Sequence, residues 1–158
     1  QIEGSDFSGS RMQHVILTEV NLSEGIFEGV DLSNVKLNDK DLSKIKFHNA
    51  ILKGADLTNS DLSDSDLSNA YLNSATLTNA NFQNANLFSA DFGGADLTNV
   101  DFSGANLKQI YIKNHYLNAC SLACSSLLVV SIRSPLVINS AKIGVANLSK
   151  AGLVSLSK

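Results

Sequence analysis

The sequence predicts an all-β protein that is built as a solenoid of five-residue repeats. Every fifth residue from Phe7 to Val137 is apolar, 27 positions in succession, of which seventeen are leucine and six are phenylalanine. Small residues recur two positions before these apolar centres, and glycine or asparagine recurs two positions after them. A period of five fits neither the 3.6 of a helix nor the 2 of a strand. It fits a short flat side that is followed by a corner.

Each position of the repeat has a predicted place. The centre and the small residue point inward, because a large side chain at the second position would crowd the axis. The residue before the centre, usually aspartate or asparagine as in Asp56 and Asn81, points outward and is suited to cap a nearby backbone donor. Glycine and asparagine after the centre tolerate the positive φ that the third residue of a type II turn requires. We therefore expect the corner at that position.

The run Ala-Asn-Phe-Gln-Asn-Ala-Asn-Leu over residues 80–87, continued by Ala90-Asp91-Phe92 and Ala95-Asp96-Leu97, resembles the A-(D/N)-(L/F)-x-x signature of the pentapeptide-repeat family. The resemblance covers about residues 2–137. It implies a right-handed quadrilateral parallel β-helix with four pentapeptides per coil, and therefore about seven coils. Adding twenty to a residue number then gives core columns, in which Phe7, Phe27 and Phe47 would stack.

The sequence divides into two parts. The pentapeptide-repeat β-helix spans residues 1–137, and a degenerate last coil or C-terminal cap spans 138–158. The repeat phase slips by one after Val137, close to Pro135, which lacks a backbone donor. A terminal helix over 141–156 is the alternative. The chain opens inside a repeat without an initiator Met or a visible cap, and solenoid ends need capping, so we expect an upstream region.

Two inward positions carry unsuitable residues, Lys40 and His115. A lysine inside the core would be costly unless its ammonium reached solvent or a partner. We therefore expect a local distortion at each position, with the side chain turned out of the core.

Charge is segregated along the chain. Residues 54–107 hold seven aspartates and no basic residue, whereas residues 108–158 hold six basic residues and no acid. A candidate acidic belt places Asp41, Asp61 and Asp101 on one side, with Asp56 and Asp96 on the next. Two interpretations stay open. The aspartates cap local backbone donors, or they form a surface that mimics DNA phosphates or steers a basic partner.

Outward apolar residues define a candidate partner-docking surface. Its members are Phe88, Tyr111, Tyr116, Leu128 and Val129. Phe88, Lys108 and Leu128 fall in one column, and Tyr111 lies on the next side. A contiguous exposed patch of this kind marks an interaction site, so we expect the C-terminal third to dock a cap, a partner or a second copy in a homodimer. Burial under the terminal segment is the alternative.

The sequence shows no chemistry typical of an enzyme. No glycine-rich phosphate loop is present, and the three histidines fall in different columns, so we expect neither a catalytic site, nor a cofactor, nor a metal centre. A net charge of −3 argues against direct binding to nucleic acid. No apolar run reaches the length of a membrane span.

These observations favour a non-enzymatic protein–protein interaction scaffold whose partner is a protein. The resemblance implies a module of a larger bacterial protein, located in the bacterial cytoplasm or, as a secreted virulence effector, in the host cell. The alternative is a DNA-mimicking protein that binds DNA gyrase or another topoisomerase, similar to the quinolone-resistance members of the family.

Overall fold

The computed structural model describes residues 4–22 and 24–112, together with the backbone of four short segments further along the chain. The five strands are β1 (Asn106–Tyr111), β2 (Tyr116–Asn118), β3 (Ser126–Ser131), β4 (Leu136–Asn139) and β5 (Val154–Leu156). All of the regular structure in these described segments is β, which agrees with the predicted class.

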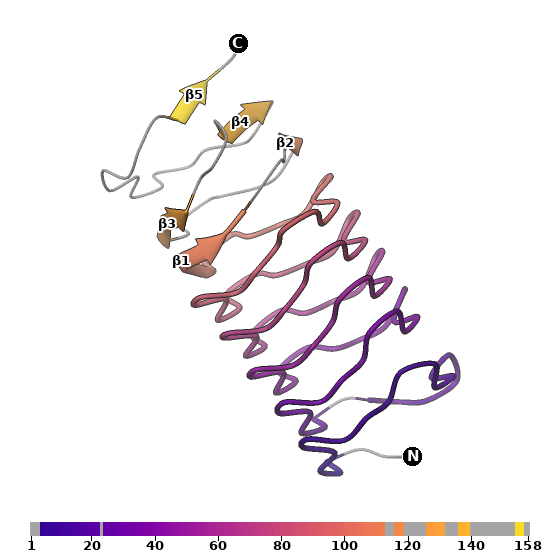
Figure 1. Ribbon diagram of the computed structural model, residues 1–158. Helices are drawn as coiled ribbons and strands as arrows, with labels where there is room; N and C mark the ends of the chain where they lie inside the picture. The colour runs from indigo at the N-terminus through magenta and orange to yellow at the C-terminus, as the bar shows by residue number, and fades with distance from the viewer. Residues whose placement is uncertain are drawn as a thin grey trace.

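The chain winds into coils of twenty residues. Parallel bridges join residues that are twenty apart, such as Asp41 with Asp61 and Asp61 with Asn81. Four five-residue sides therefore complete one coil, and the coils stack in chain order from the N-terminal end of the rod (Figure 1). The coils are joined by backbone hydrogen bonds such as Leu57 N–H to the Thr76 carbonyl at 2.8 Å.

The corners lie where the sequence predicts them. The residue two after each centre has positive φ, for example Asn59 at 57° and Asn79 at 61°. The amide of the following residue donates back to the carbonyl of the centre, as Ala80 N–H does to Leu77 at 2.9 Å. Among the corner residues in 4–22 and 24–112, Glu19 is the one outside the positive-φ set. That exception marks a local departure from the repeat.

The apolar centres form the core along the axis. Leu62, Leu77 and their equivalents from Leu22 onward are buried, and the alanines at the small inward position are buried beside them. Phenylalanine rings stack within columns, with centroids 5.1 Å apart for Phe7 and Phe27 and 5.5 Å apart for Phe82 and Phe102. The twenty-residue columns expected from the sequence are therefore confirmed.

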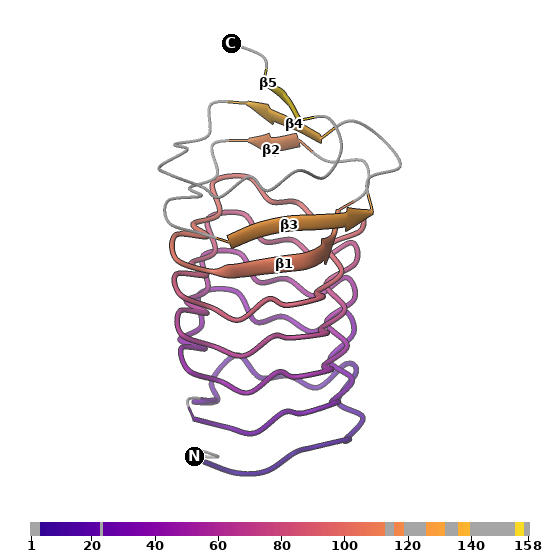
Figure 2. The ribbon, with the colours of Figure 1, turned by 90° about the vertical axis from the view of Figure 1, so that its left-hand side faces the viewer.

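The register changes toward the C-terminal end, where β1 lies beside β3 and β2, β4 and β5 follow in order (Figure 2). Lys108 pairs with Leu128 at an offset of twenty, but Ile110 pairs with Val129, one residue early. Tyr116 pairs with Val137 at an offset of 21. Tyr111 again pairs with Ser131 at an offset of twenty, so the shift at Ile110 is a local irregularity between β1 and β3.

The terminal-helix alternative is wrong for residues 154–156, which form β5 and pair in parallel with β4. The expected boundary at 137–138 and the count of about seven coils depend on residues outside the described segments, so they stay predictions. His115 also lies outside the described residues.

Candidate functional site

The acidic belt lies where the repeat places it. Bridges join Asp41 to Asp61, Asp61 to Asn81 and Asn81 to Asp101, so these four residues form one column. Bridges also join Asp56 to Thr76 and Thr76 to Asp96, in a column on the adjacent side. Neighbouring members of a column are about 4.8 Å apart, the ordinary spacing between paired strands. All of the belt carboxylates are exposed or half-buried.

The same aspartates hold the corners together. Asp56 Oδ1 accepts the Thr58 amide at 3.1 Å and the Thr58 hydroxyl at 2.7 Å. Asp61 and Asp101 accept the amides of Ser63 and Ser103 in the same way, at 2.9 Å and 2.8 Å. The expected capping is therefore confirmed. It does not remove the charge, so a belt residue both caps its turn and adds to the negative surface.

Hydrogen bonds favour the ionised carboxylate at Asp41 and Asp39. The Ser43 side chain and amide lower the pKa of Asp41 below its ordinary value. At the neighbouring corner, hydrogen bonds from Asn59 and Asn38 lower the pKa of Asp39. Both groups therefore stay charged at neutral pH.

The candidate docking surface is only partly described. Phe88 is 37% exposed and Tyr71, in a neighbouring column, is 51% exposed, as expected for outward aromatics. Tyr111 is half-buried. A Cβ on Gly93 would lie 3.2 Å from the Tyr111 ring, so the glycine leaves room for that ring on the side of the rod.

The other members of this surface are placed by their backbones. Leu128 in β3 pairs with Lys108, which agrees with the expected column, and Val129 pairs with Ile110. Tyr116 begins β2. The side chains of these three residues lie outside the described part of the chain, and their docking role stays a prediction.

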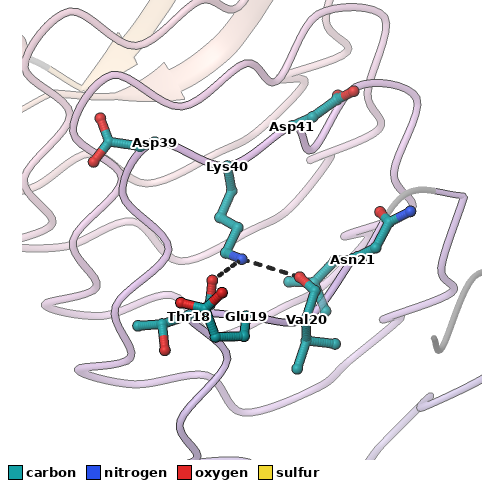
Figure 3. A pocket seen from close by; sticks show the side chains of 8 residues that line it. Thr18, Glu19, Val20, Asn21, Asp39, Lys40 and Asp41 are labelled. Carbon is teal, nitrogen blue, oxygen red and sulfur yellow. Dashed lines mark hydrogen bonds between the residues drawn. The ribbon is translucent and has the colours of Figure 1, made fainter.

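The structure shows a further site around Lys40, which the sequence identified only as an unsuitable residue at an inward position. Lys40 leaves the core and reaches the coil below, where its ammonium donates to the carbonyls of Thr18 at 2.5 Å and Val20 at 3.0 Å (Figure 3). The expected distortion at Lys40 is therefore confirmed. An open recess of about 320 Å³ lies between the two coils, and it is lined by Thr18–Leu22 and Asp39–Asp41.

The ladder is interrupted at this recess. Within the described residues, no bridge joins Ile16 to Lys36 or Asn21 to Asp41, although the equivalent pairs one coil further along are made. Ile16 is 82% exposed and Val15 is 41% exposed. We refer to the gap between residues 15–22 and 36–41 as the seam. In the sequence, the lysine at an inward position indicated that the repeat is disturbed here. Nothing in the sequence indicated that Ile16 and Val15 would be exposed.

The described segments contain neither a group of metal ligands nor a membrane-spanning helix. No group of three histidine, cysteine, aspartate or glutamate residues there is arranged to hold a metal ion. No helix in those segments has the length and apolar character to cross a bilayer.

Comparison with known proteins indicates the family to which the chain is similar. A profile described as "Pentapeptide repeat region" matches residues 45–127. A pentapeptide repeat protein of the Arabidopsis thaliana thylakoid lumen is 30% identical, with 67% of this chain and 70% of that chain covered and a TM-score of 0.42. No curated protein sequence matches the chain.

Two other solved structures have lower identity. Trypsin-treated QnrB1 R167E, a plasmid-mediated fluoroquinolone resistance protein, is 14% identical. The match covers 96% of this chain and 88% of that chain, with a TM-score of 0.44. HetL is a pentapeptide repeat protein involved in heterocyst differentiation regulation in the cyanobacterium Nostoc sp. strain PCC 7120, and it is 24% identical. The match covers 90% of this chain and 76% of that chain, with a TM-score of 0.28.

The profile match spans more than half of the chain, and it includes residues 45–112, over which the twenty-residue bridges recur. A profile match of this extent shows the family. The chain belongs to the pentapeptide-repeat family.

Proposed function

We propose that this chain is a non-enzymatic protein-interaction module whose acidic belt binds a basic surface of a partner protein. Pentapeptide-repeat proteins are generally non-enzymatic structural or interaction proteins. The observation that carries the proposal is the belt itself, five aspartates in two adjacent columns, four of which lie in a stretch of 54 residues that holds no basic residue. A concentration of one charge on one surface steers and selects partners of the opposite charge.

The structure allows the belt charge to be removed without loss of its caps. Asn81, Asn86 and Asn106 already cap their turns through Oδ1, accepting the amides of Gln83, Phe88 and Lys108. The variant Asp56→Asn/Asp61→Asn/Asp96→Asn/Asp101→Asn therefore lowers the negative charge by four and keeps the turn geometry.

The test is an affinity capture from bacterial and human-cell lysates with three baits. They are the wild-type protein, the belt variant and a matched aromatic variant, Phe88→Ser/Tyr111→Ser. We expect a protein that is retained by the wild type and the aromatic variant, lost by the belt variant and released by salt, since salt screens exposed charges. Equal retention by all three baits would contradict the belt as the binding surface.

The alternative function is DNA mimicry toward DNA gyrase or another topoisomerase. The observation that favours it is the alignment of the belt carboxylates in two adjacent columns, with Asn81 and Thr76 between them, which resembles a row of phosphates more than a scattered acidic surface. A supercoiling assay separates the two functions. Gyrase inhibition by the wild type that disappears in the belt variant supports mimicry. No inhibition at micromolar protein argues against it.

Two finer assignments belong to the same proposal. Phe88, Tyr111, Tyr116, Leu128 and Val129 form a second docking surface, which would serve a partner or a second copy of the chain. The module would act within a larger bacterial protein, as a secreted virulence effector. This assignment rests on the family resemblance, and it is tested by the sequence of the full-length gene and by secretion of its product.

A further inference from the structure

One flat side of the rod carries outward residues in a self-complementary order. Parallel bridges join Lys36 to Asp56, Asp56 to Thr76 and Thr76 to Asp96, so these residues form one column. Along the rod, the column therefore presents a cation, an anion, a hydroxyl and an anion. A second column, two residues further along each strand, carries no charge and consists of Asn38, Thr58, Thr78 and Thr98. We refer to the side that carries these two columns as the threonine side.

The charges of the threonine side are held at fixed positions. Lys36 and Asp96 are exposed, and Asp56 is half-buried. Asp56 and Asp96 each accept the amide and the hydroxyl of the threonine two residues later, at 3.1 and 2.7 Å for Asp56 and at 3.0 and 2.7 Å for Asp96. The coils stack in line, so both columns run along the rod (Figure 1). Because the carboxylates are already ordered, a contact with this side costs little further side-chain entropy.

We propose that this chain forms an antiparallel dimer in which the threonine sides of two copies face each other. The two-fold axis lies between the copies and runs along the strand direction. Rotation about this axis reverses the direction of the rod and keeps the direction of the strands, so each column faces the same column of the second copy in reverse order. Lys36 then faces Asp96 of the second copy, and Asp56 faces Thr76. Each of these contacts occurs twice.

Charge complementarity selects a second copy as the partner, and it also selects the register. The two-fold axis passes midway between the coil of Asp56 and the coil of Thr76. In that register no charge in either column faces a like charge. The other facing pairs of this side and its corner are Asn38 with Thr98, Thr58 with Thr78, Asp39 with Asn99, and Asn59 with Asn79. A shift of the axis by half a coil places Asp56 opposite either Asp56 or Asp96 of the second copy, which like-charge repulsion disfavours.

The contact area is small. Since it is one side of a narrow rod, we expect it to bury less than the roughly 1,200 Å² of a stable complex, and we expect a weak dimer. Its exposed ion pairs are screened by salt. Ile16, which is 82% exposed, precedes Lys36 by twenty residues, and the position that faces it by the same count is 116, a tyrosine. Ile16 therefore adds apolar area at each end of the contact.

The same rotation changes how the acidic belt is presented. The side next to the threonine side carries Asp41, Asp61 and Asp101. It points the same way in both copies, because the rotation keeps the strand direction. The dimer therefore presents two of these columns next to each other, with three aspartates from each copy. This consequence rests on the proposed function and deepens it, since the dimer concentrates the charge that attracts a basic partner.

The test applies sedimentation velocity and zero-length cross-linking to the full chain. We expect the weight-average sedimentation coefficient to rise with protein concentration up to about 1 mM at low salt, and to rise less at about 0.5 M salt. Carbodiimide should couple Lys36 to Asp96, and mass spectrometry identifies the joined peptides. Within one chain these residues are three coils, about 14 Å, apart, so the coupling reports a second copy. A monomer at every concentration, or dimers cross-linked without this pair, would overturn the proposal.

A charge exchange tests the register. Lys36→Glu and Asp96→Lys each place like charges in both contacts and should weaken association about tenfold or more. The double variant restores opposite charges and should recover most of the affinity. Lysine suits position 96, because Lys36 occupies the same place in the repeat. If Asp96→Lys does not fold, Asp96→Asn tests the same pair and keeps an oxygen for the cap.

The matched control is Lys53→Glu, which makes the same change of charge on another side of the coil. It should leave association within about twofold of the wild type, since an exposed charge outside the contact adds little. An equal loss in Lys53→Glu and Lys36→Glu, or no recovery in the double variant, would overturn the proposed contact.

Failure of this inference is separable from failure of the proposed function. If the wild type is monomeric and the belt variant still loses the captured protein, the dimer fails and the proposed function stands. If the Lys36–Asp96 cross-link forms but the belt variant captures the same proteins as the wild type, the proposed function fails and the dimer stands. Asp61→Asn/Asp101→Asn changes only the adjacent side, so it should lower capture and leave dimerisation intact.

Discussion

At the scale of single residues, an aspartate before the apolar centre both caps its turn and adds a negative charge to the surface. Asp31 Oδ1 accepts the Ser33 amide at 3.0 Å and the Ser33 hydroxyl at 2.6 Å, and Asp41 Oδ1 accepts the Ser43 amide at 3.0 Å. Hydrogen bonds to an ionised acceptor favour the charged form. The folding of the turn and the charge of the surface are therefore linked at Asp31 and Asp41.

This linkage predicts acid sensitivity. The Ser33 hydrogen bond lowers the pKa of Asp31, and the Ser43 hydrogen bond lowers that of Asp41, from an ordinary 3.8. Because the unfolded chain binds these protons more readily, the carboxylates stabilise the fold above pH 3.8 and lose that effect as pH falls through the lowered values. Urea unfolding should show a stability that is level from neutral pH to about pH 5 and declines below it.

The matched control for this prediction is Asp31→Asn/Asp41→Asn, which retains the cap and removes the titration. Its stability should decline less steeply between about pH 5 and pH 2 than that of the wild type. An identical decline in both proteins would show that other groups are responsible.

At the scale of one element, the corner combines two demands on a single residue. Asn79 must adopt a φ of 61°, and its amide donates to Asn59 at 2.9 Å while its oxygen accepts from Asn99 at 3.1 Å. Asparagine meets both demands, because it tolerates the left-handed region and its amide carries both a donor and an acceptor. The column Asp39, Asn59, Asn79 and Asn99 is therefore an amide ladder along one corner.

The ladder predicts that substitutions at adjacent positions differ strongly in their cost to the free energy of unfolding. Asn79→Val forces a β-branched residue into positive φ and removes two hydrogen bonds, so it should lower the free energy of unfolding by about 1–3 kcal/mol. Thr78→Val, one residue earlier, removes the hydrogen bond from the Thr78 hydroxyl to Asp96 Oδ2 at 3.0 Å but makes no such demand on the backbone, so it should cost less, about 0.5–1 kcal/mol. Thermal and urea unfolding measure both changes. Equal costs would contradict a special role for the corner.

At the scale of the whole molecule, the rod is a stack in which each coil depends on its neighbours. Pentapeptide-repeat proteins fold as right-handed quadrilateral β-helices, and the twenty-residue parallel ladder agrees with four sides per coil. In such a stack, stability is a sum of coils and of the interfaces between them. The seam weakens one interface, between residues 15–22 and 36–41.

Native-state hydrogen exchange should detect that weak interface. Leu17 and Leu62 are both buried centres, but Leu62 N–H donates to Asn81 at 2.7 Å, whereas the Leu17 amide makes no backbone bond within the described residues. We expect exchange at Leu17 to be at least about tenfold faster than at Leu62, because local opening there disrupts fewer bonds. Similar rates at the two amides would mean that the seam is closed in solution.

Much of this architecture could be predicted from the sequence, and so could part of the candidate site. The period of five determined which residues are buried, where positive φ occurs and which aspartates share a column, because each of these follows from position within one repeat. Leu62, Asn79 and the pair Asp41 and Asp61 all lie where that rule places them.

Tertiary structure alone decided how the misfits are accommodated. The sequence marked Lys40 as unsuitable for the core. The destination of its ammonium depends on the carbonyls of Thr18 and Val20, which are 22 and 20 residues away in the chain. The pairing of Ile110 with Val129 likewise depends on how two neighbouring coils fit together. A five-residue pattern specifies the direction of each side chain, whereas the gap between coils is set by contacts between coils.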